Sequence, residues 1–349
     1  MSIVLTGSTG TVGSYLAYRL LRQGRPLVLV GRGADFQARA KARIESWGPL
    51  LTWRQVRFLD WAEVQSSFEK QDFSPSHLVH SAADTNLSLK TAKNQVQTNL
   101  DLLDRALHLC RLWEIPRIDF LSSAYACGSH RGPIPESRLP RPEFFRNPYE
   151  ESKWECEERI FGLDSEFPRT RVIHRPSLIL PPILHIKGNA PRAFGRLFEK
   201  LRFLSHRTRS GDLSVSIPLG GRIGFVSLIA FIDDFLSVMD QDMGLATHVF
   251  HYTSSESPSI STWTDWIRES IPDLRVQIRP TCPAGKRILG ELEPYLRNDF
   301  VFEQSKLSRL TGKNVSSSSP LTEKYFRALI HGLLSSTGSV QNRAVEVEG

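Results

Sequence analysis

The chain has 349 residues, of which 44 are Lys or Arg and 37 are Asp or Glu, so its formal net charge is +7. Hydrophobic residues make up 40% and charged residues 23%, which excludes an intrinsically disordered or fibrous chain. This length predicts about two domains and a core that needs neither disulfides nor a structural metal.

Several classes of protein are excluded by local patterns. No secretory signal opens the sequence, and the longest apolar stretch, 225–232, is far shorter than the roughly 18 residues of a membrane span. The cysteines form no C-x-x-C pair, which argues against zinc or thioredoxin-type chemistry. We therefore expect a reduced, cytoplasmic protein with no metal and no transmembrane segment. The net charge would allow nucleic-acid binding, but no nucleic-acid-binding motif accompanies it, so we expect no such partner.

The first half alternates between short apolar segments, which predict strands, and segments with helical spacing. In chain order the predicted elements are a strand at 3–5, a helix at 13–23, strands at 27–30, 55–59 and 78–80, a helix at 87–113, a strand at 118–121, a helix at 149–161 and a strand at 172–174. Strands joined by helical crossovers indicate an α/β protein with a doubly wound parallel sheet, the Rossmann arrangement.

The second half is less regular and predicts a smaller C-terminal substrate-binding domain. Segments 225–239 and 247–253 again resemble a helix and a strand, and we expect them to return to the main sheet. The expected division is 1–176 plus about 225–254 for a dinucleotide-binding domain and about 177–224 plus 255–312 for the substrate domain. Residues 313–349 are expected to form a Ser-rich linker at 316–319, a helix at 321–334 and a loose tail.

A glycine-rich turn directly follows the first strand and precedes a helix. Such glycines let the backbone approach a pyrophosphate, and the helix N-terminus supplies N–H groups and the positive end of its dipole. A purely structural turn is the alternative. We predict a dinucleotide site whose contacts include Gly7, Thr9, Gly10, Thr11, Val12 and Gly13.

The end of the second strand indicates which cofactor is bound. An Asp or Glu there would bind the ribose 2′-hydroxyl of NAD, but the chain has Arg32, whose guanidinium can pair with a 2′-phosphate. Arg32, helped by Arg39, therefore favours NADP(H). An arginine stacked on the adenine would not discriminate, and Asp35 weighs against NADP.

Asp60 and Trp61 follow the strand at 55–59 and are also predicted to contact the cofactor. An Asp at the carboxyl end of a strand can accept a hydrogen bond from the adenine amine. It can equally cap a helix that begins at 62–64, and the two interpretations are compatible.

A serine, a tyrosine and a lysine form the candidate catalytic set. Ser123 follows the strand at 118–121, while Tyr149 and Lys153 lie four apart on one helix face. A phenol, with a pKa of about 10, is a poor acid near neutrality, and a nearby ammonium lowers that pKa. The serine hydroxyl can polarise a carbonyl oxygen while the tyrosine passes the proton. A Tyr and a Lys at this spacing also occur by chance, but the preceding motifs favour a functional pair.

Across about residues 1–255 these segments resemble the extended short-chain dehydrogenase/reductase family, which includes NAD-dependent epimerases and dehydratases. The matching segments are Thr6–Gly13, His80-Ser81-Ala82-Ala83, Asn99, Ser123, Tyr149 with Lys153, and Arg175-Pro176-Ser177. Three stretches are similar to the thioester-reductase and fatty-acyl reductase branch: His80–Thr85, Ser123-Ala124-Tyr125 and Asn147–Glu155.

The resemblance implies a role for each matched residue. Tyr149 would donate or accept the proton, Lys153 would bind the nicotinamide ribose, and Ser123 would hold the substrate oxygen. The cofactor would also contact Ala82, Ala83 and Pro176, and Asn99 would brace the adjacent strand. Sugar dehydratases of this family carry an acidic pair after the Ser or Thr, where this chain has Ala124 and Tyr125, so a dehydratase is disfavoured.

Residues 186–210 hold seven Lys or Arg and one Glu. In this segment Arg192, Arg196 and Lys200 lie four apart on one helix face, beside an apolar stripe that runs from Phe194 to Leu204. A solvated amphipathic helix is one interpretation. Docking of an anionic partner, such as an acyl carrier protein, a coenzyme A phosphate or a membrane surface, is the other.

Together these features predict an NADP-dependent oxidoreductase that reduces a carbonyl, first of all an acyl thioester, free or carrier-bound, or the derived aldehyde. Alternatives are a ketoreductase or alcohol dehydrogenase for a small metabolite, and an epimerase or isomerase that uses the cofactor transiently. A non-catalytic NADP-binding regulator is disfavoured by the intact catalytic set. We expect His80 to be structural and Cys127 not to act as a nucleophile, and a homodimer is left open.

Overall fold

The computed structural model divides the chain into two compact units. The first comprises Met1–Ile179, Gly224–Ser255 and Phe300–Ser319, and the second comprises Leu180–Ile223, Glu256–Asp299 and Pro320–Gly349. The structure describes residues 2–50, 52–62, 64, 74–87, 94–164, 166–185, 189, 192–207, 214–217, 223–254, 258–270, 275–278, 292, 294–295, 300–312 and 321–335.

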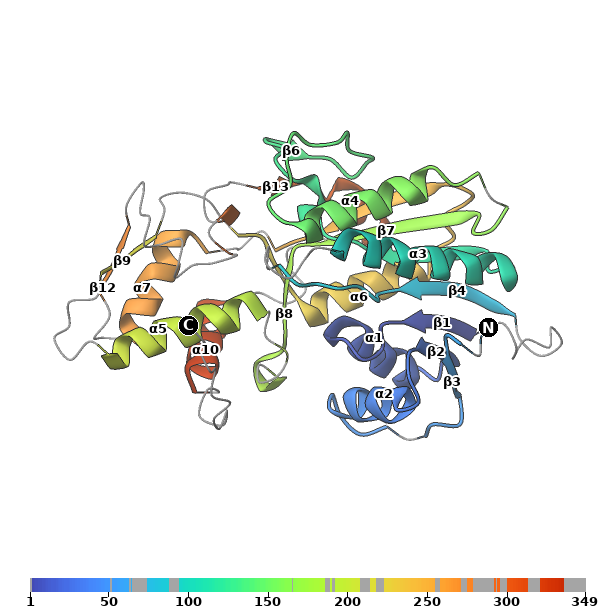
Figure 1. Ribbon diagram of the computed structural model, residues 1–349, viewed down its shortest axis with the longest axis horizontal. Helices are drawn as coiled ribbons and strands as arrows, with labels where there is room; N and C mark the ends of the chain where they lie inside the picture. Colours follow the sequence, from blue (N-terminus) through green and yellow to red (C-terminus); the bar gives the residue numbers. More distant parts are fainter. Residues whose placement is uncertain are drawn as a thin grey trace, which may run out of the picture. The chain divides into compact units, whose positions relative to one another are not determined.

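A seven-stranded sheet forms the centre of the first unit (Figure 1). Its order is β11-β7-β5-β4-β1-β2-β3, and every neighbouring pair is parallel. The strands are β1 (Ser2–Thr6), β2 (Leu27–Gly31), β3 (Val56–Asp60), β4 (Pro75–His80), β5 (Arg117–Leu121), β7 (Thr170–Pro176) and β11 (Thr247–Tyr252). This confirms the predicted doubly wound parallel sheet, including the return of 247–252 to the sheet.

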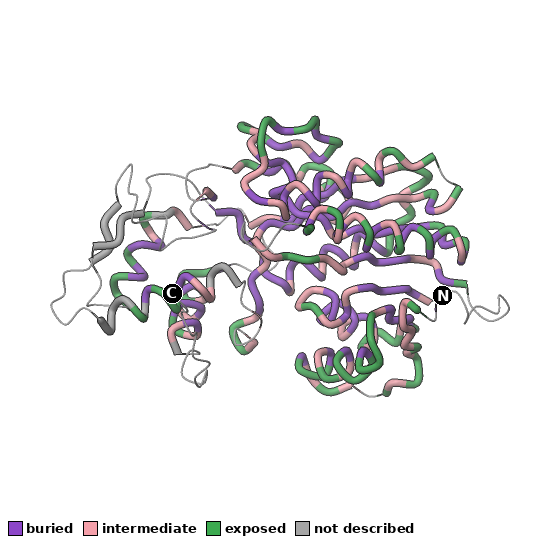
Figure 2. Tube along the Cα trace, in the orientation of Figure 1, coloured by how far each residue is buried: buried purple, intermediate pink, exposed green. Residues whose placement is uncertain are grey.

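Helices cover both faces of this sheet because side chains of each strand alternate between two apolar layers. On β1, Ile3 and Leu5 pack with α1 (Thr11–Arg22), α2 (Phe36–Glu45) and α6 (Leu228–Met239). Val4 faces the other layer, which contains α3 (Gln95–Leu112) and α4 (Pro148–Phe161). Figure 2 shows the strands as buried segments between partly exposed helices.

One helix prediction needs correction, and one helix was not predicted. The helix expected from residue 87 begins at Gln95, and residue 87 is not helical. The Gln95 amide donates hydrogen bonds to the carbonyls of Asp84 and Asn86, at 2.9 and 2.8 Å, which ties the start of α3 to the non-helical residues 84–86. Helix α2 had no sequence prediction, because its apolar stripe consists of only Phe36, Ala40 and Ile44.

Small elements complete the first unit. The 3₁₀ helix η1 (Ala124–Cys127) follows β5, and β6 (Pro133–Ile134) pairs in parallel with β13 (Val301–Phe302). β8 (Leu178–Leu180) pairs with β10 (Phe225–Ser227), and α9 (Ser305–Thr311) packs near α6. Residues 300–312 thus belong to the first unit, whereas the expected division assigned them to the substrate domain.

The second unit contains α5 (Arg192–Arg207), α7 (Ile260–Ser270), α10 (Glu323–Ser335), the 3₁₀ helix η2 (Ile183–His185) and the parallel pair β9 (Ser214–Ile217) and β12 (Arg275–Ile278). Phe326 of α10 packs against Trp263 and Trp266 of α7, with ring centroids 5.1 and 5.6 Å apart. The expected Ser run at 316–319 lies outside the described residues, as does the expected tail at 335–349 apart from Ser335, which is the last residue of α10. In the described part of the chain, no helix is long and apolar enough to cross a membrane.

Candidate active site

The turn between β1 and α1 uses its glycines for two different purposes. A Cβ on Gly7, whose φ is +81°, would lie 2.6 Å from the Ala82 nitrogen, and a Cβ on Gly13 would lie 2.3 Å from the Gly7 oxygen. These two glycines therefore allow the turn to pack against β4 and α1. Gly10 is exposed, and the nearest atom to a Cβ there would be the Gly7 oxygen at 3.4 Å. Space for a side chain thus exists at Gly10.

This turn has the properties of an anion cradle. Gly10 is the N-cap of α1 but offers no side-chain hydrogen bond, and the first turn carries no acidic residue. Its N–H groups and dipole are therefore available to a bound anion. The buried Ser8 hydroxyl also has no hydrogen-bond partner within the described ranges. The turn fits a dinucleotide pyrophosphate. Thr9 lies in the turn, Thr11 and Val12 lie in the first turn of α1, and all three are partly buried.

Three arginines lie on the β2–α2 segment. Arg32 is exposed at the end of β2, and its carbonyl accepts a hydrogen bond of 2.7 Å from Arg39. Arg39 also pairs with Asp35 at 2.9 Å, so the acidic residue that argued against NADP is neutralised by a neighbour. Arg43, which the sequence analysis missed, donates to the Thr11 hydroxyl at 3.0 Å and so links α2 to the glycine-rich turn.

Asp60 shapes the same region from the end of β3. One carboxylate oxygen accepts a hydrogen bond from the Gly33 N–H at 2.6 Å, and the other accepts from Ala62 N–H at 2.8 Å. The Trp61 N–H donates to the Gly31 carbonyl at 2.9 Å. Asp60 and Trp61 therefore hold the loop after β2 in place, while most of the helix that Asp60 was expected to cap lies outside the described residues.

The predicted catalytic residues come together at the carboxyl end of the sheet. Tyr149, in the first turn of α4, makes a side-chain hydrogen bond with Ser123, which follows β5. The Lys153 ammonium donates to the Leu121 carbonyl at 2.7 Å and lies 5.8 Å from the centre of the Tyr149 ring. Ser123 and Lys153 are buried, and Tyr149 is half-buried. The helical spacing thus predicts this grouping correctly.

Burial controls the proton affinities of these groups. It raises the pKa of Tyr149 above its usual value of 10, and the hydrogen bond with Ser123 opposes this rise. The lowering of this pKa that was expected from the neighbouring ammonium is therefore wrong for this structure, because burial outweighs it. Burial also lowers the pKa of Lys153 from 10.5 to about 8. An uncharged phenol that touches a serine hydroxyl beside a readily titrated ammonium can hold and transfer a proton.

Local contacts fix the start of α4. Asn147 caps the helix, because its side-chain oxygen accepts a hydrogen bond from Glu150 N–H at 3.0 Å, and Pro148 occupies the first turn. The buried Asn99 amide donates to the Ser152 hydroxyl at 2.8 Å and to the Asp84 carbonyl at 3.0 Å. Asn99 therefore braces the loop after β4 against α4.

The other residues named from the sequence occupy nearby strand ends. Ala82 and Ala83 follow β4 and are partly buried, and Pro176 is buried at the end of β7. His80 is buried, contacts the Thr6 hydroxyl at 2.9 Å and has its pKa lowered by burial to about 3, so it is neutral. Burial raises the pKa of Cys127 to about 12, which disfavours the thiolate.

Sequence analysis missed a buried group next to the catalytic set. Glu157, one helical turn after Lys153, accepts a hydrogen bond from the Ser122 hydroxyl and forms a two-point ion pair with Arg175, at 2.9 and 2.5 Å. All three side chains are buried. The four-residue spacing between Lys153 and Glu157 was the available signal.

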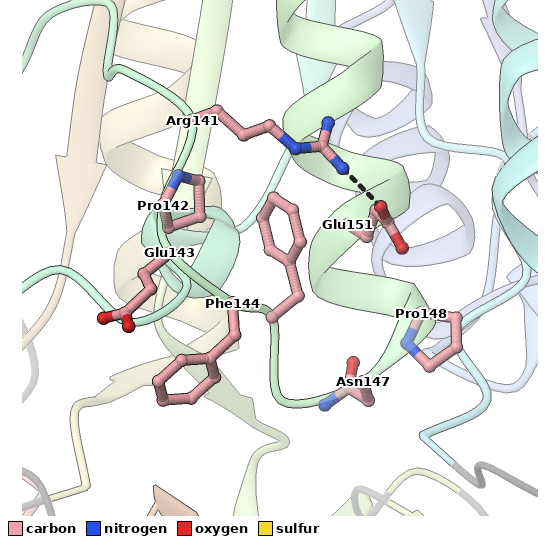
Figure 3. A pocket seen from close by; sticks show the side chains of 8 residues that line it. Arg141, Pro142, Glu143, Phe144, Asn147, Pro148 and Glu151 are labelled. Carbon is pink, nitrogen blue, oxygen red and sulfur yellow. Dashed lines mark hydrogen bonds and ion pairs between the residues drawn. The ribbon is translucent and has the colours of Figure 1, made fainter.

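A pocket of about 370 Å³ opens beside the loop that precedes α4. Its walls include Arg141, Phe144, Asn147 and Glu151, and Arg141 pairs with Glu151 at 2.6 Å (Figure 3). Tyr149, Lys153 and Ser123 do not line this pocket, so it is separate from the catalytic group.

Three comparisons relate this geometry to known proteins. A model of the NAD dependent epimerase/dehydratase family matches residues 3–194. No curated protein matches the sequence. Solved structures with the same fold include the terminal R domain of the myxalamid PKS-NRPS biosynthetic pathway, with a TM-score of 0.73 and 16% identity over 96% of this chain and 90% of that chain.

Sugar-nucleotide epimerases share the fold as well. The UDP-glucuronic acid 4-epimerase from Bacillus cereus in complex with NAD has a TM-score of 0.64 and 18% identity, with 96% of both chains covered. The UDP-glucose 4-epimerase from Bifidobacterium longum in complex with NAD+ and UDP has a TM-score of 0.65 and 15% identity, over 97% of this chain and 99% of that chain.

The family model spans more than half of the chain and includes the glycine-rich turn, Ser123, Tyr149 and Lys153. At identities this low, the solved structures establish the fold alone. The protein belongs to the NAD dependent epimerase/dehydratase family of extended short-chain dehydrogenases/reductases, whose enzymes use a nicotinamide cofactor.

Proposed function

We propose that the protein is an NADP-dependent reductase that acts on the carbonyl of an acyl thioester or of the derived aldehyde. The observation that carries the proposal is the hydrogen bond between Tyr149 and Ser123 beside the buried Lys153. This contact supports the proposal because one carbonyl oxygen could then meet both a proton donor and a polarising hydroxyl.

The chain's own residues handle the oxygen and the proton. Ser123 receives a hydrogen bond from Tyr125 N–H at 3.2 Å, which orients its hydroxyl, and that hydroxyl polarises the carbonyl oxygen. Tyr149 gives its proton to the same oxygen as negative charge develops there. Lys153 stabilises the resulting phenolate because an adjacent positive charge favours the ionised form. A nicotinamide, when bound, supplies the hydride that the carbonyl carbon accepts. With a thioester this gives a hemithioacetal, whose C–S bond then breaks. The sulfur takes up the proton that the hydroxyl releases, and the products are the aldehyde and a free thiol.

The cofactor is proposed to be NADP(H). The glycine-rich turn and the N-terminus of α1 would hold the pyrophosphate, and Arg32, Arg39 and Arg43 would meet a 2′-phosphate. The pairing of Asp35 with Arg39 supports this choice, since it removes an unpaired carboxylate from the phosphate region.

Dehydration of a sugar is disfavoured by the residues after Ser123. Ala124 and Tyr125 are buried there, and the Tyr125 hydroxyl donates to the Gly224 carbonyl at 3.1 Å. Neither side chain offers the acid that an elimination needs. The fold shared with the terminal R domain of a PKS-NRPS biosynthetic pathway supports thioester reduction as the first choice.

Epimerisation of a sugar nucleotide is the second candidate. It is favoured by the full-length similarity to UDP-sugar 4-epimerases, because the same tyrosine, serine and lysine could also oxidise and re-reduce a sugar hydroxyl. No net consumption of NADPH accompanies that reaction.

The decisive experiment follows NADPH absorbance with purified protein and three substrate sets. Medium- and long-chain acyl thioesters of coenzyme A or pantetheine are compared with their aldehydes and with ketones, and UDP-glucose and UDP-glucuronate are analysed for epimers. Thioester-dependent NADPH consumption with aldehyde or alcohol as product supports the proposal. Epimer formation without NADPH consumption, or turnover of ketones alone, contradicts it.

A further inference from the structure

A buried polar group connects three elements that carry the catalytic residues. Glu157 lies on α4. Its carboxylate accepts hydrogen bonds from the Ser122 hydroxyl, at the end of β5, and from Nε and Nη2 of Arg175, at the end of β7. Each of these residues neighbours a member of the site. Ser122 precedes Ser123, Arg175 precedes Pro176, and Glu157 is one helical turn after Lys153.

Apolar packing alone does not fix the position of α4 along the sheet. Cys156 and Ile160 of α4 pack in the layer that also holds Phe120 and Ile173, and such contacts are non-directional. A two-point Arg–carboxylate pair is directional, since its fork and carboxylate must lie in one geometry. A displacement of about 1 Å at a catalytic group can cost roughly 100-fold in rate.

Stability by itself gives no reason for this group. A buried ion pair gains little over apolar side chains of the same volume, because both charges must leave water. Unlike apolar side chains, the ion pair between Glu157 and Arg175 is directional and carries charge.

Glu157 lies one helical turn after Lys153 on α4, and its negative charge raises the pKa of Lys153 against the lowering by burial. The groups around Lys153 include Cys156, Tyr149 and, from β4, His80. Burial raises the pKa of Cys156 to about 12 and lowers that of His80 to about 3, so both are neutral near pH 8. Burial also keeps Tyr149 neutral. Glu157 is therefore the charged partner among these groups.

We propose that Glu157 is a positioning residue for the catalytic set: through Ser122 and Arg175 it fixes α4 against the ends of β5 and β7. Its negative charge also favours the ammonium form of Lys153. This inference rests on the proposed function for its kinetic consequence, but its electrostatic consequence exists in the protein without substrate or cofactor.

The test replaces Glu157 by Gln, which keeps the size of the side chain and removes the charge. In protein labelled with isotope-enriched lysine, the Lys153 Cε resonance is assigned by its loss in Lys153→Met and titrated with pH by NMR. The midpoint is expected to fall by about 0.5–1 pH unit. In NADPH-dependent reduction, kcat is expected to fall about tenfold or more with little change in KM.

Asp119→Asn is the matched control. Asp119 is equally buried and has a two-point pair with Arg117, at 3.0 and 2.8 Å, but it is not among the groups that act on Lys153. The Asp119→Asn variant is expected to be less stable than the wild type, while the pH midpoint of Lys153 stays unchanged. An unchanged midpoint in Glu157→Gln, or an equal shift in Asp119→Asn, overturns the proposal.

A milder variant keeps the proposal testable if Glu157→Gln does not fold. Ser122→Ala removes one contact and leaves the ion pair, so we expect an unchanged Lys153 midpoint and a severalfold lower kcat. Unchanged kcat contradicts the positioning role. If the wild-type protein reduces no thioester or aldehyde, the proposed function fails, and the NMR titration of Glu157→Gln still decides the role of Glu157.

Discussion

The hydroxyl of Tyr149 is expected to matter for proton transfer but not for cofactor binding. Tyr149→Phe keeps the ring and removes the hydroxyl that contacts Ser123. We expect turnover to fall by about 100- to 10,000-fold, the usual contribution of a positioned acid, while NADPH affinity stays the same. Initial rates and a fluorescence titration with NADPH measure the two quantities separately. Activity close to that of the wild type would remove Tyr149 from the mechanism.

Lys153 gives the reaction a predicted pH dependence. Burial lowers the pKa of its ammonium to about 8, so the positive charge is present below that pH and is lost as the pH rises through it. The phenolate of Tyr149 then loses its stabilising neighbour, and the rate of reduction is expected to decline above about pH 8. The pH profile of kcat measures this decline. In Lys153→Arg the guanidinium does not titrate in this range, so the decline is expected to disappear even if the variant is slower.

At the scale of elements, the β1–α1 turn predicts opposite effects for two glycine substitutions. Gly10→Asp adds a favourable N-cap at a position with space for it, so thermal stability is expected to stay equal or rise. The added carboxylate occupies the anion cradle, and NADPH affinity is expected to fall about tenfold or more.

Gly13→Ala is the comparison for that turn. Its Cβ would lie 2.3 Å from the Gly7 oxygen, so we expect a loss of about 1–3 kcal/mol in stability, measured by thermal or denaturant unfolding. For the Gly10→Asp variant, an NADPH affinity equal to that of the wild type would show that the cofactor does not bind at this turn.

The β2–α2 segment predicts which nicotinamide cofactor is preferred. Arg32→Asp removes an exposed cation at the end of β2 and adds an anion beside the expected 2′-phosphate. NADPH affinity is expected to fall about tenfold or more relative to NADH affinity, because only NADPH carries the additional phosphate. Isothermal titration with each cofactor gives the ratio, with the exposed Arg57 of β3, changed to Asp, as the control. An unchanged ratio would contradict the assignment of NADP.

The elements of the sheet were predictable because their signals are local. Apolar runs such as Leu27–Val30 end at a glycine or a polar residue, and Tyr149 and Lys153 share a helix face by spacing alone. The start of α3 was not predictable, since the Gln95 side chain that holds the preceding loop competes with helical pairing. The Glu157 group joins Ser122 and Arg175 across 35 and 18 positions of the sequence, and only the folded sheet brings them together.

At the scale of the whole molecule, charge is concentrated in one segment. Residues 186–210 carry seven basic residues and one acidic residue, a local net charge of +6 against +7 for the chain. Within this segment α5 buries Leu197, Phe198 and Leu201 in the second unit, so its apolar stripe is part of a core. The apolar stripe of this helix is therefore intramolecular packing. Of its charged residues, Lys200 is exposed and Arg196 is half-buried.

We expect the basic residues of α5 to recognise an acidic carrier domain that presents the acyl thioester. Arg192, Arg196 and Lys200 lie four apart on α5, and long-range attraction of this kind raises association rates and weakens with salt. Changing all three to Glu is expected to raise KM for a carrier-bound thioester about tenfold at low salt and to leave kcat and KM for the matching free aldehyde unchanged.

The control of equal charge changes three exposed arginines of the first unit to Glu: Arg54, Arg105 and Arg111. Because both triple variants have the same net charge, a rise in KM confined to the α5 variant identifies a docking face rather than a global field. An equal effect on the free aldehyde would instead show that α5 affects the site itself, and an equal effect in both variants would leave net charge as the cause.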